Sequence, residues 1–128
     1  MSEGDDRFSQ EIDGATLEKL YALAWKHEDA GDRDAAVLLF KIGAHFGEPM
    51  SMCVLADILS EPPRFPDIKT AEELYKKAGM AGYATAFHNL AVMYGHVGKS
   101  ELSQRYMKIA TDRGAGPWED DNDEGAPD

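Results

Sequence analysis

Gly98, Lys99 and Ser100 reproduce the end of a phosphate-binding loop. In such a loop backbone amides hold the phosphates, the lysine contacts them and the serine binds a magnesium ion. That chemistry requires a first glycine five residues before Gly98, and a strand before that glycine. Met93 stands at the required position, and the residues before it have a helical pattern. We therefore expect no nucleotide site.

Five residues are of types that bind metal ions or act as nucleophiles: His27, His45, His88, His96 and Cys53. No histidine belongs to an HExxH motif, and the cysteine belongs to no CxxC motif. His88 and His96 share a helix face but lie about 12 Å apart along its axis, too far for one metal ion. A single cysteine forms no internal disulfide, which agrees with a reducing compartment. We expect no enzyme activity, cofactor or metal.

The residues from Thr70 to Tyr94 have the pattern of two helices joined at a glycine. Small residues and larger apolar ones recur at helical spacing, which lets two helices pack closely. Gly82 follows twelve residues of helical pattern, where a left-handed glycine ends a helix at little cost. This stretch predicts a helix, a turn and a second helix.

The same pattern recurs along the chain every 32 to 35 residues. The equivalent glycines are Gly47, Gly82 and Gly114. Small residues precede them by eleven positions, at Ala36, Ala71 and Ser103, and large apolar residues by seven, at Phe40, Tyr75 and Met107. A fixed period is the signature of stacked units. We predict an all-α fold in which residues 15–114 form three helical pairs, 15–47, 48–82 and 83–114.

Three residues are placed to cap the second helix of each pair: Asp32, Asp67 and Ser100. Their side chains can accept hydrogen bonds from the exposed amides of the first turn. The first helix is expected from Ala15 to Asp29, and the third begins near Met50.

A family resemblance rests on the central stretch, which reads Ala71-x-x-Leu74-Tyr75-x-x-Ala78-Gly79-x-x-Gly82-x-Ala84-x-Ala86 and then Leu90-Ala91-x-x-Tyr94. This run resembles the Sel-1-like repeat, a relative of the tetratricopeptide repeat (TPR), and the first and third pairs are nearer the TPR pattern. The sequence departs from the pattern at His27 and Leu59, where a tyrosine is usual, and at Ser103, where alanine is usual. The resemblance implies a right-handed solenoid of three helix-turn-helix repeats that binds other proteins and has no chemistry of its own.

In repeats of this kind the first helices line the concave side of the stack. If Leu23, Leu55 and Leu90 point between helices, the helical period places one set of residues on that side. The expected partner-binding residues are Tyr21, Trp25, Glu28, Asp29, Cys53, Asp57, His88, Asn89, Val92 and His96. Tyr21 and Trp25 would anchor the partner, and Asp57 would orient it. The alternative for Trp25 is burial under the N-terminal segment, against Phe8.

The net charge of −11 belongs mainly to the two ends of the chain. Residues 1–14 carry −4 and residues 115–128 carry −6, so the region between them is at −1. We expect a flexible acidic N-terminal segment and a disordered acidic C-terminal tail. Without a basic patch, nucleic-acid binding is not expected. The 128-residue sequence suits one domain and has neither a signal peptide nor a membrane-spanning pattern, so we expect a cytoplasmic protein.

The last helix of a stack has an apolar face that needs a cover. Leu102, Tyr106 and Ile109 form a stripe on this helix, which Trp118, a second copy of the chain or a partner protein could cover. The sequence thus favours a protein-binding adaptor or scaffold whose partner is another protein. The alternative is an inhibitor, such as the immunity protein of a bacterial toxin, which would need much tighter binding.

Overall fold

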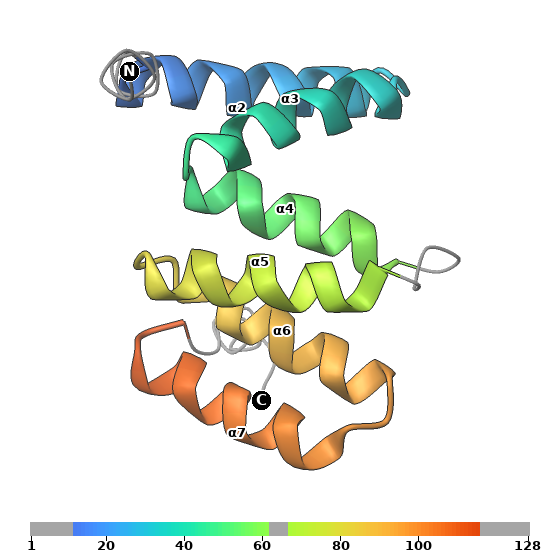
Figure 1. Ribbon diagram of the computed structural model, residues 1–128, viewed down its shortest axis with the longest axis vertical. Helices are drawn as coiled ribbons and strands as arrows, with labels where there is room; N and C mark the ends of the chain where they lie inside the picture. The colour runs from blue at the N-terminus through green and yellow to red at the C-terminus, as the bar shows by residue number, and fades with distance from the viewer. Residues whose placement is uncertain (1–11, 62–66, 116–128) are drawn as a thin grey trace, which may run out of the picture.

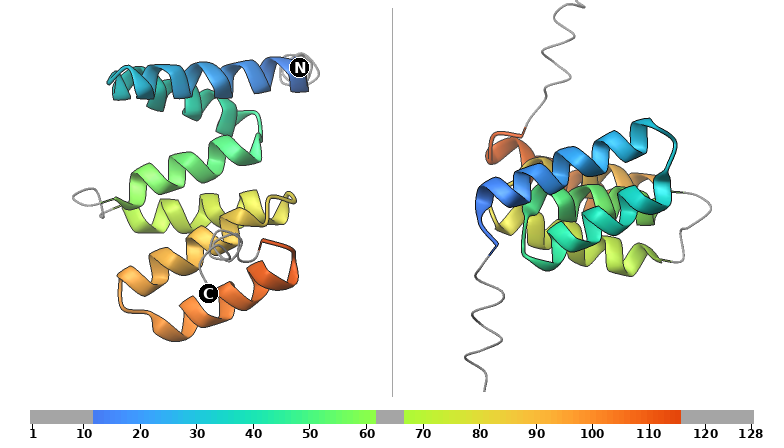
Figure 2. Two further views of the ribbon diagram at one scale, coloured as in Figure 1. Left: turned by 180° about the vertical axis from the view of Figure 1, so that it is seen from behind. Right: turned by 90° about the horizontal axis from the view of Figure 1, so that it is seen from above.

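The computed structural model describes residues 12–61 and 67–115, and over these residues it contains only helices and connecting turns. The helices are α2 (Gly14–Asp29), α3 (Arg33–His45), α4 (Pro49–Ser60), α5 (Ile68–Met80), α6 (Thr85–His96) and α7 (Ser100–Asp112). They follow one another in chain order along the long axis of the molecule, and each runs across that axis (Figures 1 and 2). Each helix packs against the next, and α4 also contacts α6. The all-α prediction is confirmed for the described residues.

Glycines end every described helix except α4, and all of them do so with the same hydrogen bonds. At the end of α5, Gly82 has a φ of 107°, and its amide donates to the carbonyl of Gly79. The next amide, of Tyr83, donates to the carbonyl of Ala78. This paired arrangement satisfies carbonyls that the helix end leaves free. It recurs at Gly31, Gly47, Gly98 and Gly114, each with a positive φ.

The beginnings of the helices match the sequence only in part. Asp32 caps α3, as predicted, because its carboxylate accepts from the amide of Ala35. Asp67 precedes α5 but makes no side-chain cap bond, so the prediction of a cap there was wrong. The predicted cap Ser100 is instead the first residue of α7, and Lys99 precedes it without a side-chain bond. Helix α4 begins at Pro49, one residue earlier than expected.

Two clusters of buried side chains form the core, and α4 contributes to both. One cluster lies between the N-terminal pair and α4 and consists of Ala24, Ala36, Phe40 and Ile58. The other extends from α4 to α7 and includes Met52, Tyr75, Phe87, Leu90 and Tyr94. Helix α4 therefore has apolar side chains on opposite faces, which fits its high share of buried residues.

The expectation that three equivalent leucines point between helices holds for two of them. Leu55 and Leu90 are buried, whereas Leu23 is 43% exposed. In the later pairs the first helix packs against the helix before it, as α4 does on α3 and α6 does on α5. Within the described residues no helix precedes α2, so Leu23 has no such neighbour.

The apolar stripe on α7 is not an uncovered face. Leu102, Tyr106 and Ile109 are partly buried and pack against the larger cluster. The Tyr106 ring lies 6.0 Å from the ring of Phe87 and 5.7 Å from that of Tyr94, centre to centre. The stripe therefore belongs to the core of the third pair. The expected contacts of Phe8 and Trp118 lie outside the described residues.

No helix in the described part of the chain is long and apolar enough to cross a membrane.

Candidate functional site

The candidate site is organised by the last turn of α4. Cys53 and Asp57 are four residues apart and therefore share one face of this helix. Glu61 follows the helix with an extended backbone, at φ −73° and ψ 141°. The next residue in the sequence is Pro62, and a residue before proline is disfavoured in the helical conformation. The helix therefore ends here without a glycine, and Glu61 remains next to Asp57.

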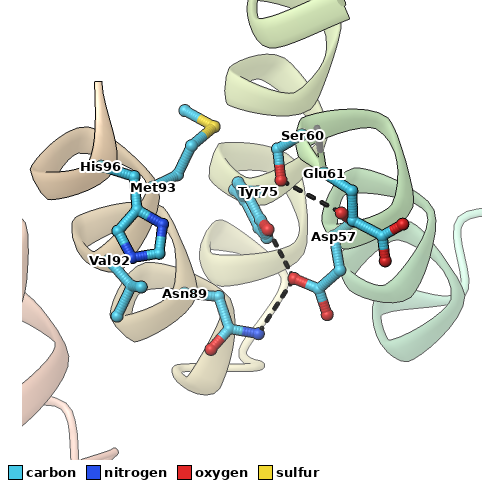
Figure 3. A pocket seen from close by; sticks show the side chains of 8 residues that line it. All are labelled: Asp57, Ser60, Glu61, Tyr75, Asn89, Val92, Met93 and His96. Carbon is cyan, nitrogen blue, oxygen red and sulfur yellow. Dashed lines mark hydrogen bonds between the residues drawn. The ribbon is translucent and has the colours of Figure 1, made fainter. Parts of the chain in front are cut away.

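Asp57 is bound by two side chains from other helices. The Tyr75 hydroxyl of α5 donates to Asp57 Oδ1 at 2.5 Å, and the Asn89 amide of α6 donates to the same oxygen at 3.2 Å (Figure 3). The Ser60 hydroxyl donates to the Asp57 main-chain carbonyl at 3.1 Å. Three helices therefore hold one carboxylate in a fixed position.

The charge state of Asp57 reflects opposing effects. Burial raises the pKa of its carboxyl above the ordinary value, and the hydrogen bonds from Tyr75 and Asn89 partly oppose this rise. The nearby negative charge of Glu61 raises it further. Within residues 12–61 and 67–115, no lysine, arginine or histidine forms an ion pair with Asp57. The carboxylate is thus half-buried without a cationic partner from the described chain.

Cys53 is buried and accepts a weak hydrogen bond from the Asn89 amide at 3.4 Å. Burial and the charge of Asp57 raise the pKa of its thiol to about 12. The thiol is therefore protonated at neutral pH, and a protonated thiol is a poor nucleophile. Cys53 supports the position of Asn89 and packs in the core.

A cavity of about 400 Å³ opens between α4, α5 and α6, and we call it the α6 cavity. Figure 3 shows its lining: Asp57, Ser60, Glu61, Tyr75, Asn89, Val92, Met93 and His96. The α6 residues are spaced at three, four and seven positions after Asn89, so one face of that helix supplies them. One wall is apolar, through Val92 and Met93, and the opposite wall has two carboxylates, those of Asp57 and Glu61.

A second cavity, of about 230 Å³, lies on the other side of α4, and we call it the α2 cavity. Its lining residues are Trp25, Glu28, Arg33, Phe40, Val54, Asp57, Ile58 and Glu61. Asp57 and Glu61 line both cavities, so the two are adjacent. We name them together the Asp57 groove. It extends from the aromatic side chains of α2 and α3 to the α6 residues near His96.

Arg33 links the helices at one end of the groove. Its guanidinium donates two hydrogen bonds to Glu28, at 2.6 and 3.2 Å, and a third to Glu61 at 2.9 Å. The bonds from Arg33 lower the pKa of the Glu28 carboxyl. Because all three groups are partly exposed, these ion pairs position the side chains more than they stabilise the fold.

The aromatic wall of the α2 cavity is partly exposed. Trp25 is 38% exposed, and its ring lies edge-on to Phe40 at 5.4 Å and to Tyr21 at 6.3 Å, centre to centre. Phe40 is buried and fixes the other two rings from below. Trp25 therefore combines a supported ring with an open surface.

The structure brings together many of the residues predicted for partner binding. Six of them line the Asp57 groove: Trp25, Glu28, Asp57, Asn89, Val92 and His96. Tyr21 supports Trp25 from outside the cavities, and His88 lies beside Asn89, with 3.4 Å between Nδ1 and Oδ1. Cys53 is buried behind the groove, and Asp29 is exposed and lines neither cavity.

Sequence reasoning missed several of the residues that line the groove. Tyr75 was assigned to the core as a large apolar residue, yet its hydroxyl reaches the groove. Glu61 follows Asp57 by four residues, and this helical spacing could have indicated that the two carboxylates lie side by side. Arg33 and Met93 had no pattern that marked them.

In the described part of the chain, no group of three or more histidine, cysteine, aspartate or glutamate side chains is placed to hold a metal ion. A scan against protein-family models finds no match for this chain, and a search among curated proteins finds no similar sequence. The site must therefore be interpreted from its own chemistry.

Proposed function

We propose that this chain is a non-catalytic protein-interaction module that binds a segment of another protein in the Asp57 groove. The observation that carries the proposal is that two adjacent cavities share one fixed carboxylate, with a partly exposed aromatic side chain at one end. Binding sites commonly combine apolar walls with a few fixed polar groups. Because the lining residues of the two cavities come from α2 to α6, we infer that the ligand is an extended segment rather than a compact small molecule.

A repeat architecture of the Sel-1-like or TPR type is part of the proposal. The helix-ending hydrogen bonds at Gly47, Gly82 and Gly114 are alike, and they recur at the sequence period. The first helices α4 and α6 contact one another, as neighbouring repeats of a right-handed solenoid would. In such a stack the inner layer is a binding surface, and the Asp57 groove lies along it.

The proposed function gives Cys53 and Asp57 no catalytic role. The thiol of Cys53 is buried and protonated, and Asp57 already accepts two hydrogen bonds. A general base must lie within hydrogen-bonding distance of the substrate proton that it removes, and a nucleophile must be activated by a neighbouring base or a lowered pKa. A fixed carboxylate between apolar walls is better suited to binding a ligand than to catalysis.

Photo-crosslinking tests the location of the binding surface. Val92 and Val97 are exposed to a similar extent, 39% and 41%, but only Val92 lines the groove. A photoreactive phenylalanine analogue would be placed at each position, in cells that naturally express the chain. We expect a specific crosslinked protein at position 92 and a much weaker product at position 97. Equal products, or a product at position 97 alone, would place binding elsewhere.

Trp25→Ala then measures the aromatic anchor with the captured partner. We expect a loss of about 2 kcal/mol or more in binding, because exposed aromatics on a rigid support often dominate interface energies. Val97→Ala is the matched control. Circular dichroism of both variants separates lost binding from lost folding, since Trp25 also packs on Phe40.

The affinity for that partner distinguishes an adaptor from an inhibitor of a toxin. An adaptor groove would bind reversibly, near micromolar dissociation constants, whereas a toxin inhibitor would bind far more tightly. Isothermal titration with the purified partner gives this value directly.

A further inference from the structure

We infer that the Asp57 groove recognises a lysine side chain of the partner segment, with its ammonium group on Asp57 and its methylene chain along Val92 and Met93 in the α6 cavity. This inference deepens the proposed function and rests on it for the identity of the ligand as a protein segment.

The first argument is charge complementarity. Among the described groove residues, the carboxylates of Glu28, Asp57 and Glu61 outnumber the two basic side chains, those of Arg33 and His96. Arg33 bonds Glu28 and Glu61 and makes no ion pair with Asp57. An ionised carboxylate that is half-buried without a cation is unfavourable, and a cationic ligand removes this cost.

The second argument concerns the two oxygens of Asp57. Oδ1 accepts both bonds, from Tyr75 and Asn89. Oδ2 accepts none from the described residues, and in Figure 3 no dashed line reaches it. One available oxygen suits the compact ammonium group of lysine. The planar guanidinium of arginine is best matched by two parallel acceptors, which Asp57 does not offer.

The third argument is the shape of the α6 cavity. Val92 and Met93 give it an apolar wall opposite the carboxylates, and Ser60 and Glu61 lie next to Asp57 with further acceptor oxygens. A lysine can lay its methylenes on apolar surface while its head group reaches a polar site. The α2 cavity is less suitable, because Arg33 lines it and would repel a second cation.

The probes for a direct test are n-butylammonium, n-butanol and n-butylguanidinium, which share one alkyl chain. Each would be titrated into the full chain and followed by amide chemical shifts in nuclear magnetic resonance. We expect saturable shifts at residues 57, 89 and 92 with butylammonium, about tenfold tighter than with butanol, which is about 1.4 kcal/mol. Butylguanidinium should bind more weakly than butylammonium. Equal binding of butanol and butylammonium, or tighter binding of butylguanidinium, overturns the inference.

Two substitutions make the test specific. Asp57→Asn should abolish the preference for butylammonium over butanol. Asp29→Asn makes the same chemical change at an exposed residue outside both cavities and should leave the preference intact. Retention of the preference in Asp57→Asn would show that another group binds the amine and would overturn the inference.

The captured partner separates this inference from the proposed function. If a partner crosslinks at position 92 and its affinity falls at least tenfold with Asp57→Asn and with a lysine-to-methionine change in its crosslinked segment, both stand. If it crosslinks there but neither change alters the affinity, the groove function stands and the lysine site fails. If no partner crosslinks at position 92 but butylammonium binds at Asp57, the protein-binding function fails while the amine site remains.

Discussion

The Tyr75 hydroxyl and the Asp57 carboxylate join the second helix of the central pair to the first through a hydrogen bond of 2.5 Å. Burial and the charge of Asp57 raise the pKa of Tyr75 well above its ordinary value, so the hydroxyl keeps its proton and donates it toward Oδ1. This contact closes the floor of the groove, and it is the most direct target for substitution.

Tyr75→Phe should lower the free energy of unfolding by about 2 kcal/mol, because a buried carboxylate oxygen loses its shorter hydrogen bond. Denaturant unfolding measures the change. Tyr106→Phe is the control, since its hydroxyl has no described hydrogen bond and its ring remains stacked on Phe87. In an Asp57→Ala background the effect of Tyr75→Phe should become much smaller, and an unchanged effect would mean that the two residues are not coupled.

Asp57→Asn should raise the melting temperature at neutral pH. A carboxyl whose pKa is higher in the folded than in the unfolded state binds its proton more tightly when folded, so stability falls as pH rises through the interval between the two pKa values. The loss is complete above the folded-state pKa. Asparagine carries no charge and can still accept from Tyr75 and Asn89.

Melting curves from pH 3 to pH 8 test this sign. The advantage of Asp57→Asn over the parent chain should be largest at high pH and should shrink as pH falls through the pKa of Asp57. Glu73→Gln removes an exposed acid with the same change in net charge and should show no such trend. A variant that is less stable than the parent at every pH would contradict the expected charge burial.

Gly82→Val should destabilise the protein by more than about 1 kcal/mol. The φ of 107° at Gly82 is strongly unfavourable for a β-branched residue, although no heavy atom outside the neighbouring residues lies within 4 Å of an added Cβ. Gly14→Val is the control, because Gly14 also has open space but no positive φ. Thermal unfolding of both variants separates backbone strain from steric contact, and equal effects would rule out strain.

Gly79→Ala tests the close approach of α5 and α6. An alanine Cβ at this position would lie 2.5 to 2.7 Å from three ring carbons of Phe87, so the protein should lose about 1 to 3 kcal/mol despite the better helix propensity of alanine. Gly95→Ala should instead be neutral or stabilising, since its nearest neighbour is Ser103 Oγ at 3.4 Å. Phe87→Leu in the Gly79→Ala background should restore part of the loss. Failure of both comparisons would mean that the two helices can separate freely.

The helix starts named from the sequence lie close to the observed ones, because local chemistry defines helix ends. Helix α2 begins at Gly14 where Ala15 was expected, and α4 begins at Pro49 where Met50 was expected. Gly47, Gly82 and Gly114 end helices with a positive φ, and Asp32 caps α3, as the sequence indicated. Asp67 and Ser100 failed as caps because capping depends on side-chain direction, which residue type alone does not determine. Leu23 was assigned to a helix interface, but that interface requires a helix before α2. A sequence repeat identifies equivalent positions, and it does not show whether each position has a neighbouring helix.

The sequence predicted only part of the candidate site. The first helices supplied six of its lining residues at the predicted positions, because one helix face follows from the helical period. The contributions of Tyr75 and Arg33 depend on how the second helices pack, and Glu61 depends on the extended backbone after α4. These are tertiary relationships that a single sequence does not encode locally.

Because α4 contributes buried side chains to both core clusters, a ligand in the groove can affect local unfolding. Ile58 is the buried residue that α4 contributes to the N-terminal cluster, whereas Met52, Cys53 and Ala56 belong to the larger one. Amide protons of α2 and α3 should therefore exchange with solvent through an opening that leaves α5 and α6 intact. A ligand that contacts Trp25 and Asp57 together would hold this opening shut, and its affinity would include the free energy of closing the first pair onto the second.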